Sequence, residues 1–539
     1  MNSLVLTNVL AAVVGSTVLV GMTYSWLLPK PLANIPHNPV TSIWGDLPAI
    51  AKAKKGGRRP FMDSVCDVIS MRDRIVQILI GRHILVIISD IKETERLMFD
   101  SRVTELPKRI NQAFGIVLPN GQLAMRTDDK WKRHRRLAGP SMSRRYLERM
   151  STRISTSANN LAKLWKAKMN IAGACAFDAC LDIQLATMDN IVGLTTGAPL
   201  GCIEATLAAL TTGHIQSTGV MHFPHPNPPP LFRAILRMLE TIEAATKALS
   251  PSLYGRFVKF TSASWRKEYA TLSAFVNNQI SESRKREEMN MGEKLGSILS
   301  TDADCVVDMI IQREAREGVE AFGEGEIHDE LLLYVFGGQD TTAALLRWLV
   351  KYLPQDPEIQ HRLHKEVCSE FGGEDDVGEY LDFNAIDDPE RMPLLEAVIV
   401  ETLRCAGVAA QTGRELIQDA TILGRFVPRG TQLVFAMALM SRDKEAWGPD
   451  ADEWRPTRWL TPDGAFDRSA GPSLPFGLGQ RSCFGQRLAM LQAKIFTATL
   501  SRSFFFKPVP PEVDSWEAYE TVTKQPEQCY VSLEGWEKK

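Results

Sequence analysis

The segment from Pro475 to Gly485 reads PFGLGQRSCFG and stands directly before an apolar run at residues 488–491. Its glycines carry no Cβ, so the backbone there can closely approach a large, flat group. The apolar run predicts a helix, and a thiolate at a helix N-terminus is stabilised by unpaired backbone N–H groups and by the helix dipole. The segment therefore predicts a glycine-rich loop that presents Cys483 at the start of a helix.

This loop has the composition expected of a haem-binding site. Cys483 would be the axial thiolate ligand of the iron, and Arg481 would pair with a haem propionate. The alternative is a strand-turn-helix in which the cysteine is a small hydrophobic core residue. The combination of glycines, arginine and helix start favours the haem site.

The composition excludes several other kinds of site. The chain has 539 residues and a net charge of −2, so no basic field indicates nucleic-acid binding. Its nine cysteines form no CxxC pair, which indicates neither a zinc site nor a disulfide framework. We expect a reduced protein that faces the cytosol.

The first 29 residues, Met1 to Pro29, contain no charged side chain. The apolar run Leu4–Leu28 suffices for a membrane-spanning helix, which needs about 20 residues. Lys30 and later basic residues follow the run, so the positive-inside rule puts the remainder of the chain in the cytoplasm. We expect a retained single-pass anchor over residues 1–29. A cleaved signal peptide is the alternative, but the basic segment that it requires is missing.

Prolines at positions 29, 31, 36 and 39 predict a stiff neck over residues 30–45, because proline fixes φ and breaks helices. The globular part would then extend over residues 46–539. Near its start, two apolar β-branched runs, Ile75–Ile80 and Ile84–Ile88, are joined by a short segment that begins with Gly81. This pattern predicts a β-hairpin.

A basic stretch at residues 130–136 contains Trp131 and Arg135, which are four apart and share one helix face. Both can donate to one anion, such as a haem propionate. The alternative is a solvated basic helix. The remaining cations of the stretch are a candidate docking face for an acidic electron-transfer partner, and they are Lys130, Lys132, Arg133 and Arg136.

A long helix is predicted to begin near Glu326 and to run past Trp348. It contains two adjacent glycines, Gly337 and Gly338, which cost stability inside a helix and so indicate a special role. The hydroxyl of Thr341 can bond to the carbonyl four residues back, beside the gap that the glycines leave. With Asp340 as an acid next to it, this arrangement suits proton delivery to bound oxygen. A helix-packing glycine pair is the alternative.

A later helix carries Glu401 and Arg404, which are three apart and can form an ion pair. Arg458 lies downstream in a proline-containing loop. A carboxylate that bridges two guanidiniums would be a buried structural lock that sets the loop of Cys483 and performs no chemistry. An ordinary surface ion pair is the alternative.

As a set, these residues resemble the signatures of the cytochrome P-450 family, the haem-thiolate monooxygenases, over nearly the whole chain. Phe476 to Gly485 match the family's FxxGxRxCxG haem signature, so Phe476 joins the candidate cofactor contacts. Trp131 and Arg135 match the family's propionate-binding WxxxR motif, and Asp340 and Thr341 match its oxygen-activation motif. Glu401 and Arg404 match the ExxR pair, and Arg458 matches the third partner of that pair.

Two positions depart from the family pattern. Arg414 falls where the family often has another propionate contact, but the usual preceding proline is replaced by Ala409 and Ala410. Trp454 and Trp459 stand around Arg458 where phenylalanines are more usual. We expect the second departure to leave catalysis unaffected.

The resemblance implies a mainly α fold with small β-sheets and one haem b (iron protoporphyrin IX). It also implies electrons from NADPH through an NADPH-cytochrome reductase. The anchor and neck resemble the microsomal, fungal-type class, which implies a single-pass protein of the endoplasmic reticulum membrane with a cytosolic catalytic domain.

The reaction that the resemblance implies inserts one oxygen atom of O2 into a substrate. We expect that substrate to be lipophilic, because the segments expected to line the site are largely apolar. They are residues 114–123, 333–337 and 406–411. A terpenoid or polyketide in secondary-metabolite biosynthesis is the first expectation, and fatty-acid hydroxylation is the second. A haem-thiolate isomerase or dehydratase and a non-catalytic haem-binding membrane protein are the alternatives from other classes. The presence of Asp340 and Thr341 favours the monooxygenase.

Overall fold

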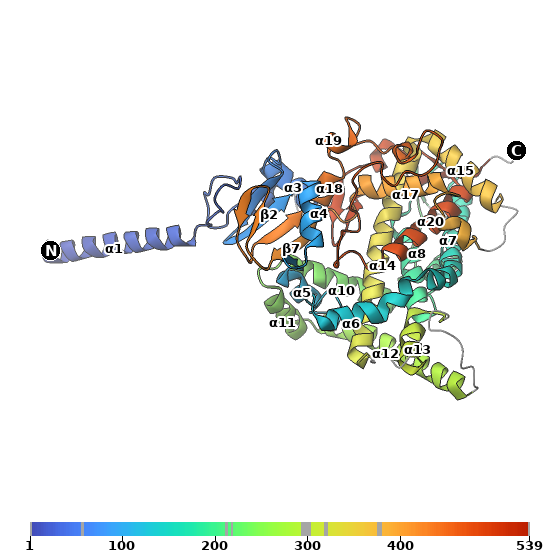
Figure 1. Ribbon diagram of the computed structural model, residues 1–539, viewed down its shortest axis with the longest axis horizontal. Coiled ribbons are helices and arrows are strands. Elements are labelled where there is room, and N and C mark those ends of the chain that lie inside the picture. The colour runs from blue at the N-terminus through green and yellow to red at the C-terminus, as the bar shows by residue number, and fades with distance from the viewer. Residues whose placement is uncertain are drawn as a thin grey trace. The chain divides into compact units, whose positions relative to one another are not determined.

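The computed structural model describes residues 3–54, 59–210, 214–216, 219–292, 303–316, 322–373 and 380–536. This part of the chain is mainly helical with small β-sheets, as the sequence predicts (Figure 1). Two compact units are present, Met1–Glu105 with Gln411–Met440 and Leu106–Ala410 with Ser441–Lys539. The single catalytic domain expected over residues 46–539 stays a prediction.

The first unit is built around a sheet of order β1-β2-β10-β7-β3. Strands β1 (Ile75–Ile80) and β2 (His83–Ile88) pair antiparallel with Ile80 opposite His83, which confirms the predicted hairpin. Gly81 opens the two-residue turn with a φ of 56°, a conformation that favours glycine. The inward side chains of both strands pack with Met62 and Val65 in a hydrophobic core.

The remaining elements of this unit are short, apart from helix α1. Helix α1 (Ser3–Leu27) occupies the predicted anchor, and residues 30–44 of the predicted neck contain no helix or strand. Within the described residues, no helix combines the length and the apolar character needed to cross a membrane. The other elements are α2 (Leu47–Ala53), α3 (Phe61–Val68), α4 (Ile91–Phe99), β3 (Thr104–Glu105), β7 (Thr412–Leu416), β8 (Ala420–Ile422), β9 (Arg425–Val427), β10 (Gln432–Phe435) and α18 (Met437–Met440).

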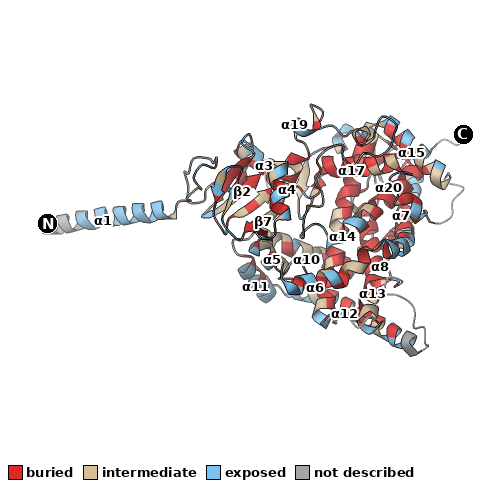
Figure 2. Cartoon of the chain, in the orientation of Figure 1, coloured by how far each residue is buried: buried red, intermediate tan, exposed pale blue. Residues whose placement is uncertain are grey.

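The second unit is a helical assembly around α14 (Glu324–Tyr352), which confirms the predicted long helix. Figure 2 shows that α14 and its neighbours α8 (Cys180–Thr196), α17 (Pro393–Ala406) and α20 (Gln486–Ser503) are largely buried. Helix α7 (Arg144–Ala172), which packs against α8 and α20, is buried on one side only. A sheet of order β11-β14-β4-β6-β5 and the hairpin β12–β13 complete the unit.

The other helices and strands of the second unit lie between and after these elements. They are α5 (Lys108–Phe114), α6 (Asp129–Ala138), β4 (Ala176–Asp178), α9 (Cys202–Ala208), β5 (His214–Gln216), β6 (Val220–His222), α10 (Pro230–Lys247), α11 (Pro251–Thr261), α12 (Ala263–Gly292), α13 (Val306–Arg316), α15 (Pro357–Phe371), α16 (Phe383–Ile386), α19 (Lys444–Trp447), β11 (Phe505–Lys507), β12 (Ala518–Glu520), β13 (Lys524–Pro526) and β14 (Tyr530–Glu534).

Candidate active site

The loop before α20 has the predicted form. Its two ends are tied together by a hydrogen bond of 2.8 Å from the backbone N–H of Cys483 to the carbonyl of Phe476. Gly477 and Gly479 have φ values of 64° and 72°, which side chains rarely adopt. Helix α20 starts directly after its N-cap, Gly485. The cysteine is thus held on a tight loop at a helix start.

The side chain of Cys483 is exposed in this structure. The surrounding protein nevertheless desolvates the thiol, and this raises its pKa above the ordinary value, while the backbone N–H of Gly485 and the charge of Arg135 lower it. The stabilising groups predicted for a thiolate are therefore present but do not outweigh desolvation. A metal ion bound to the sulfur would supply the missing stabilisation, because a coordinating thiol loses its proton.

Helix α14 passes close to this loop. The rings of Tyr334 and Phe484 meet edge to face with centroids 5.9 Å apart. One turn further along α14, Gly337 is exposed although most of the helix is buried, and a Cβ there would meet nothing within 4 Å. The exposed Cys483 and the open face of Gly337 thus lie on two segments that contact each other through Phe484, next to Cys483, and Tyr334, three residues before Gly337.

The two glycines of α14 have different roles. A Cβ on Gly338 would lie 2.5 Å from Cδ1 of Ile191 on α8, so this glycine allows the two helices to pack closely. Gly337 faces open space instead. The alternative considered from the sequence, a helix-packing glycine, therefore describes Gly338, whereas the predicted gap belongs to Gly337.

The predicted acid and alcohol point to different surroundings. The hydroxyl of Thr341 donates to the carbonyl of Gly337 at 2.7 Å, as predicted, and this puts it beside the open face. The carboxylate of Asp340 instead accepts from Thr523 Oγ1 at 2.7 Å and from Gln525 Nε2 at 2.8 Å. Burial raises the pKa of Asp340, and these two donors only partly offset the rise. The acid is therefore bound to the β12–β13 hairpin.

Two cations converge on Trp131 of α6. The guanidinium carbon of Arg481 lies 4.4 Å from the centre of the Trp131 ring, and that of Arg135 lies 5.3 Å from it. Arg135 donates to the carbonyls of Gln480 and Ser482, each at 3.2 Å. The structure therefore brings the three candidate propionate residues together beside the loop of Cys483.

The cations expected to form a docking face are partly neutralised. Lys130 and Arg133 pair with Glu326 of α14 at 3.2 and 3.1 Å. Lys132 pairs with Asp129 at 3.3 Å, where both side chains are exposed. Because Lys130 and Arg133 are paired with Glu326, they attach α6 to α14, an internal role that the local sequence pattern does not predict.

Arg414 lies on β7 of the first unit, opposite Leu433 of β10. Its side chain is buried, and Nη1 donates to the carbonyl of Gly413 at 2.8 Å. The propionate contact that the resemblance implies for Arg414 stays a prediction.

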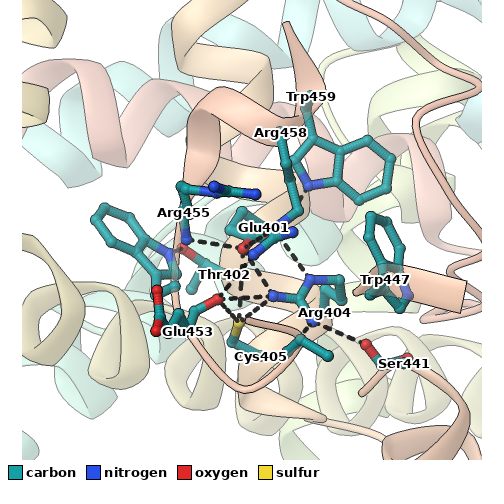
Figure 3. A network of polar contacts seen from close by, with 12 residues as sticks. Glu401, Thr402, Arg404, Cys405, Ser441, Trp447, Glu453, Arg455, Arg458 and Trp459 are labelled. Carbon is teal, nitrogen blue, oxygen red and sulfur yellow. Dashed lines mark hydrogen bonds and ion pairs between the residues drawn. The ribbon is translucent and has the colours of Figure 1, made fainter. Parts of the chain in front are cut away.

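Glu401, Arg404 and Arg458 form one buried network (Figure 3). Arg404 donates to both oxygens of Glu401, at 2.7 and 2.8 Å, and Arg458 Nε donates to Glu401 Oε1 at 2.9 Å. Arg404 also donates to the carbonyls of Ser441 and Ala451. Burial alone would raise the pKa of Glu401. Arg404 and the other donors lower it by more than burial raises it, so the pKa lies below its ordinary value. One carboxylate thus bridges two guanidiniums, the geometry expected from the sequence.

Two tryptophans take part in this network. The indole N–H of Trp459 donates to Glu401 Oε2 at 2.8 Å, and that of Trp454 donates to Thr402 Oγ1 at 3.0 Å. Phenylalanine cannot make either bond. The sequence signal was the replacement itself, since a tryptophan in a buried loop usually finds an acceptor.

These residues fit a haem. The exposed thiolate donor, the glycines without neighbours around their Cβ positions, and the two guanidiniums match one iron, one flat ring and its carboxylates.

Comparison with known proteins agrees with this geometry. A family model described as cytochrome P450 matches residues 39–533. The chain is 25% identical to the cytochrome P450 monooxygenase TRI13 of Fusarium sporotrichioides, over 95% of this chain and 96% of the relative. It is also 25% identical to the cytochrome P450 monooxygenase xilC of Penicillium crustosum, over 95% and 94% of the two chains. A crystal structure of a cytochrome P450 (CYP102L1) shares the fold, with a TM-score of 0.72 at 17% identity over 94% of this chain and 99% of that one.

Proposed function

Because the chain belongs to the cytochrome P450 family and is a monooxygenase of that family, we propose that it holds haem b with Cys483 as the axial ligand. The observation that carries this proposal is the exposed thiol of Cys483 before α20, beside the charge of Arg135 and next to Phe484, which contacts the helix that carries Gly337. The bound haem supplies the activation of O2, with one oxygen atom going to the substrate and the other to water.

The residues around the loop bind and orient the cofactor. Arg135, Arg481 and the indole N–H of Trp131 would hold the propionates, because all three converge at one point. Phe476 fixes the loop through its carbonyl bond to Cys483. The Glu401 network holds the segment of residues 450–459 in place and contributes no chemistry.

Thr341 and Asp340 would manage protons. The hydroxyl of Thr341 donates a hydrogen bond to the carbonyl of Gly337. The lone pairs of the hydroxyl oxygen can therefore accept a hydrogen bond from water or another donor at the open face. Asp340 is half-buried with a raised pKa and contacts the hairpin residue Thr523, so it can take up a proton on the hairpin side. A rotation of its carboxylate toward Thr341 would then deliver that proton.

Electrons would come from NADPH through an NADPH-cytochrome reductase. Helix α6 carries both the propionate residues and a cationic surface, which suits an acidic partner. Since Lys130 and Arg133 are bound to Glu326, the cations that we propose for docking are Lys132 and Arg136.

We propose that the protein is a single-pass protein of the endoplasmic reticulum membrane, with its catalytic part in the cytosol. Helix α1 is 25 residues long, and its side chains from Val13 to Trp26 include eight large exposed apolar groups. A second apolar surface supports contact with a bilayer, because α11 exposes Leu253, Phe257 and Phe260, and Leu249 is exposed two residues before it, all by 65–85%. Carbonate extraction of cell membranes would release the protein if helix α1 does not anchor it.

The substrate is proposed to be lipophilic, since the half-buried apolar side chain of Leu333 lies one turn before Gly337 on the same helix face. A terpenoid or polyketide of secondary metabolism is the first candidate, supported by the similarity to fungal monooxygenases. A fatty acid is the second. Co-expression with candidate biosynthetic enzymes and analysis of the products would separate the two.

The axial ligand is tested by the spectrum of the reduced protein with carbon monoxide. The wild type and Cys66→Ala, a change at another exposed cysteine, should give the red-shifted Soret band of thiolate-bound haem, and Cys483→Ala should not. A wild-type spectrum typical of imidazole ligation would contradict the proposal.

A second experiment separates the monooxygenase from an isomerase, a dehydratase or a non-catalytic haem protein. Turnover with reductase should consume NADPH and O2 together with product formation. Thr341→Ala should break this coupling, whereas Thr196→Ala, which removes a similar helix hydroxyl bond away from the site, should not. Product formation without O2 would contradict the monooxygenase mechanism.

A further inference from the structure

We propose that Glu330 is a positioning residue for the haem propionates, because this one buried carboxylate of α14 fixes both the helix that carries Arg135 and the segment that binds Arg481. The inference rests on the proposed haem site. Glu330 and His134 are fully buried, with side-chain exposures of 0% each. A carboxylate at such a position costs free energy unless its oxygens are hydrogen-bonded.

The first oxygen of Glu330 positions helix α6. Nδ1–H of His134 donates to Glu330 Oε1 at 2.8 Å. His134 stands three residues after Trp131 and directly before Arg135. The bond therefore fixes the rotation of α6 at the point where its two propionate residues project.

The second oxygen positions the segment before α6. Nε2 of Gln122 donates to Glu330 Oε2 at 2.7 Å. The same segment binds Arg481 through three oxygen atoms. The guanidinium of Arg481 donates to the carbonyls of Gln122 and Met125, at 3.2 and 2.8 Å, and to Thr127 Oγ1 at 2.8 Å. Glu330 thus acts on Arg481 through Gln122.

Neighbouring acids of α14 complete the attachment. Glu326, one turn earlier, pairs with Lys130 and Arg133 of α6. Asp329 accepts a hydrogen bond of 2.7 Å from the backbone N–H of Asn120, at the start of the segment that reaches Arg481. Each of these acids touches one side of the site, whereas Glu330 touches both.

Removal of the carboxylate would leave two buried donors, on His134 and Gln122, without their acceptor. The unpaired groups would move or admit water, and the arginines that they hold would lose their fixed orientation. Groups that orient the ligands of a metal site in this indirect way typically change its affinity by about 10- to 100-fold. We therefore expect Glu330 to control how firmly the haem is held.

The test measures the rate of haem transfer from the purified full-length holoenzyme to excess apomyoglobin. Glu330→Ala should release haem at least about tenfold faster than the wild type. Haem release from Glu330→Gln should stay within about threefold of the wild-type rate, because its amide oxygen still accepts from Gln122. Its N–H can donate to Nδ1 of His134 in the ring tautomer whose proton is on Nε2, which lies 3.4 Å from Glu326. The reduced carbon monoxide spectrum of each variant should keep the thiolate band.

Asp182→Asn is the matched control. Asp182 is also fully buried, on α8, and accepts hydrogen bonds from Lys168 and Trp165. This variant should lower the melting temperature but leave the haem transfer rate unchanged. Equal acceleration in Asp182→Asn and Glu330→Ala would mean that any loss of stability releases haem, and would overturn the inference.

If Glu330→Ala fails to fold, His134→Leu and Gln122→Leu each remove one of its two bonds. Each should accelerate haem transfer by part of the full effect, and a wild-type rate in both would overturn the inference. A wild type without the thiolate band would instead overturn the proposed haem site, so the two failures are distinct.

Discussion

The hydroxyl of Thr523 donates a hydrogen bond of 2.7 Å to Oδ2 of Asp340, and so ties the acid of α14 to the β12–β13 hairpin. Gln525, two residues along, occupies the other oxygen. The acid that lies next to Thr341 in sequence is therefore oriented by residues of a hairpin far along the chain. Proton delivery in this enzyme would require Asp340 to exchange one partner for another.

Asp340→Asn should lower oxygen-dependent turnover by about 100-fold, because the amide keeps the shape of the carboxyl group but cannot carry its proton. The haem spectrum should stay unchanged, since Asp340 does not touch the loop of Cys483. Product formation with saturating reductase, measured in H2O and in D2O, checks this expectation. Wild-type turnover and isotope effect in Asp340→Asn would show that protons reach the site by another route.

The adjacent glycines of α14 should respond to alanine in opposite ways. Gly337→Ala should raise the unfolding free energy by up to about 1 kcal/mol through helix propensity, because its new methyl group meets no neighbour. Gly338→Ala should lower it by about 1–3 kcal/mol, since Ile191 must move aside. Denaturant titration of both variants measures the difference.

Carbon monoxide binding should be affected by the change at Gly337 and not by the change at Gly338. The methyl group of Gly337→Ala fills part of the open face beside Thr341, so it should slow carbon monoxide binding to the reduced protein. Gly338→Ala, combined with Ile191→Ala to restore space, should recover stability and bind carbon monoxide normally. Equal stability losses in the two single variants would contradict the assignment of packing to Gly338 alone.

Glu326 should make the stability of the enzyme depend on acid pH. Burial raises its pKa, but the N–H of Gly323 and the side chains of Lys130, Arg133 and His134 outweigh this and bring it to about 2. A depressed pKa in the folded state stabilises the protein above the ordinary value of 4.5, and this contribution is lost as the pH falls toward 2.

Glu326→Gln should therefore lower the unfolding free energy by about 1 kcal/mol at pH 6, and its difference from the wild type should narrow at pH 3.5. Urea titrations at the two pH values measure this. Glu240→Gln, at the exposed pair with Arg237, is the control and should show no such narrowing. A difference that is constant between the two pH values would contradict the role of Glu326.

Local patterns were sufficient for much of the fold and for the centre of the site. The β1–β2 hairpin, helix α14 and the loop of Cys483 each depend on a few neighbouring residues, whose spacing and glycines determine the backbone. The Glu401 bridge was also predicted, since its helix pair is local and only Arg458 had to be brought from elsewhere in the sequence.

Contacts between distant segments could not be predicted in this way. Asp340 is bonded to Thr523, in the turn before β13, at a separation of 183 residues, and His134 is bonded to Glu330 of α14 at a separation of 196 residues. Nothing in the local pattern indicates which of several polar groups will meet such a residue. The same holds for Lys130, which looked like a docking cation and is paired to Glu326.

Trp459 offers the sharpest test of the network that holds residues 450–459. Its indole N–H fills a lone pair of Glu401, a fully buried carboxylate that also binds both guanidiniums. Trp459→Phe keeps most of the packing against Trp447 and removes only this donor, so it should lower the unfolding free energy by about 1–3 kcal/mol. Trp516→Phe, at a tryptophan that is 38% exposed, should change it by less than about 0.5 kcal/mol. Urea titration of the two variants compares these values, and equal small effects would mean that Glu401 is fully stabilised by its arginines.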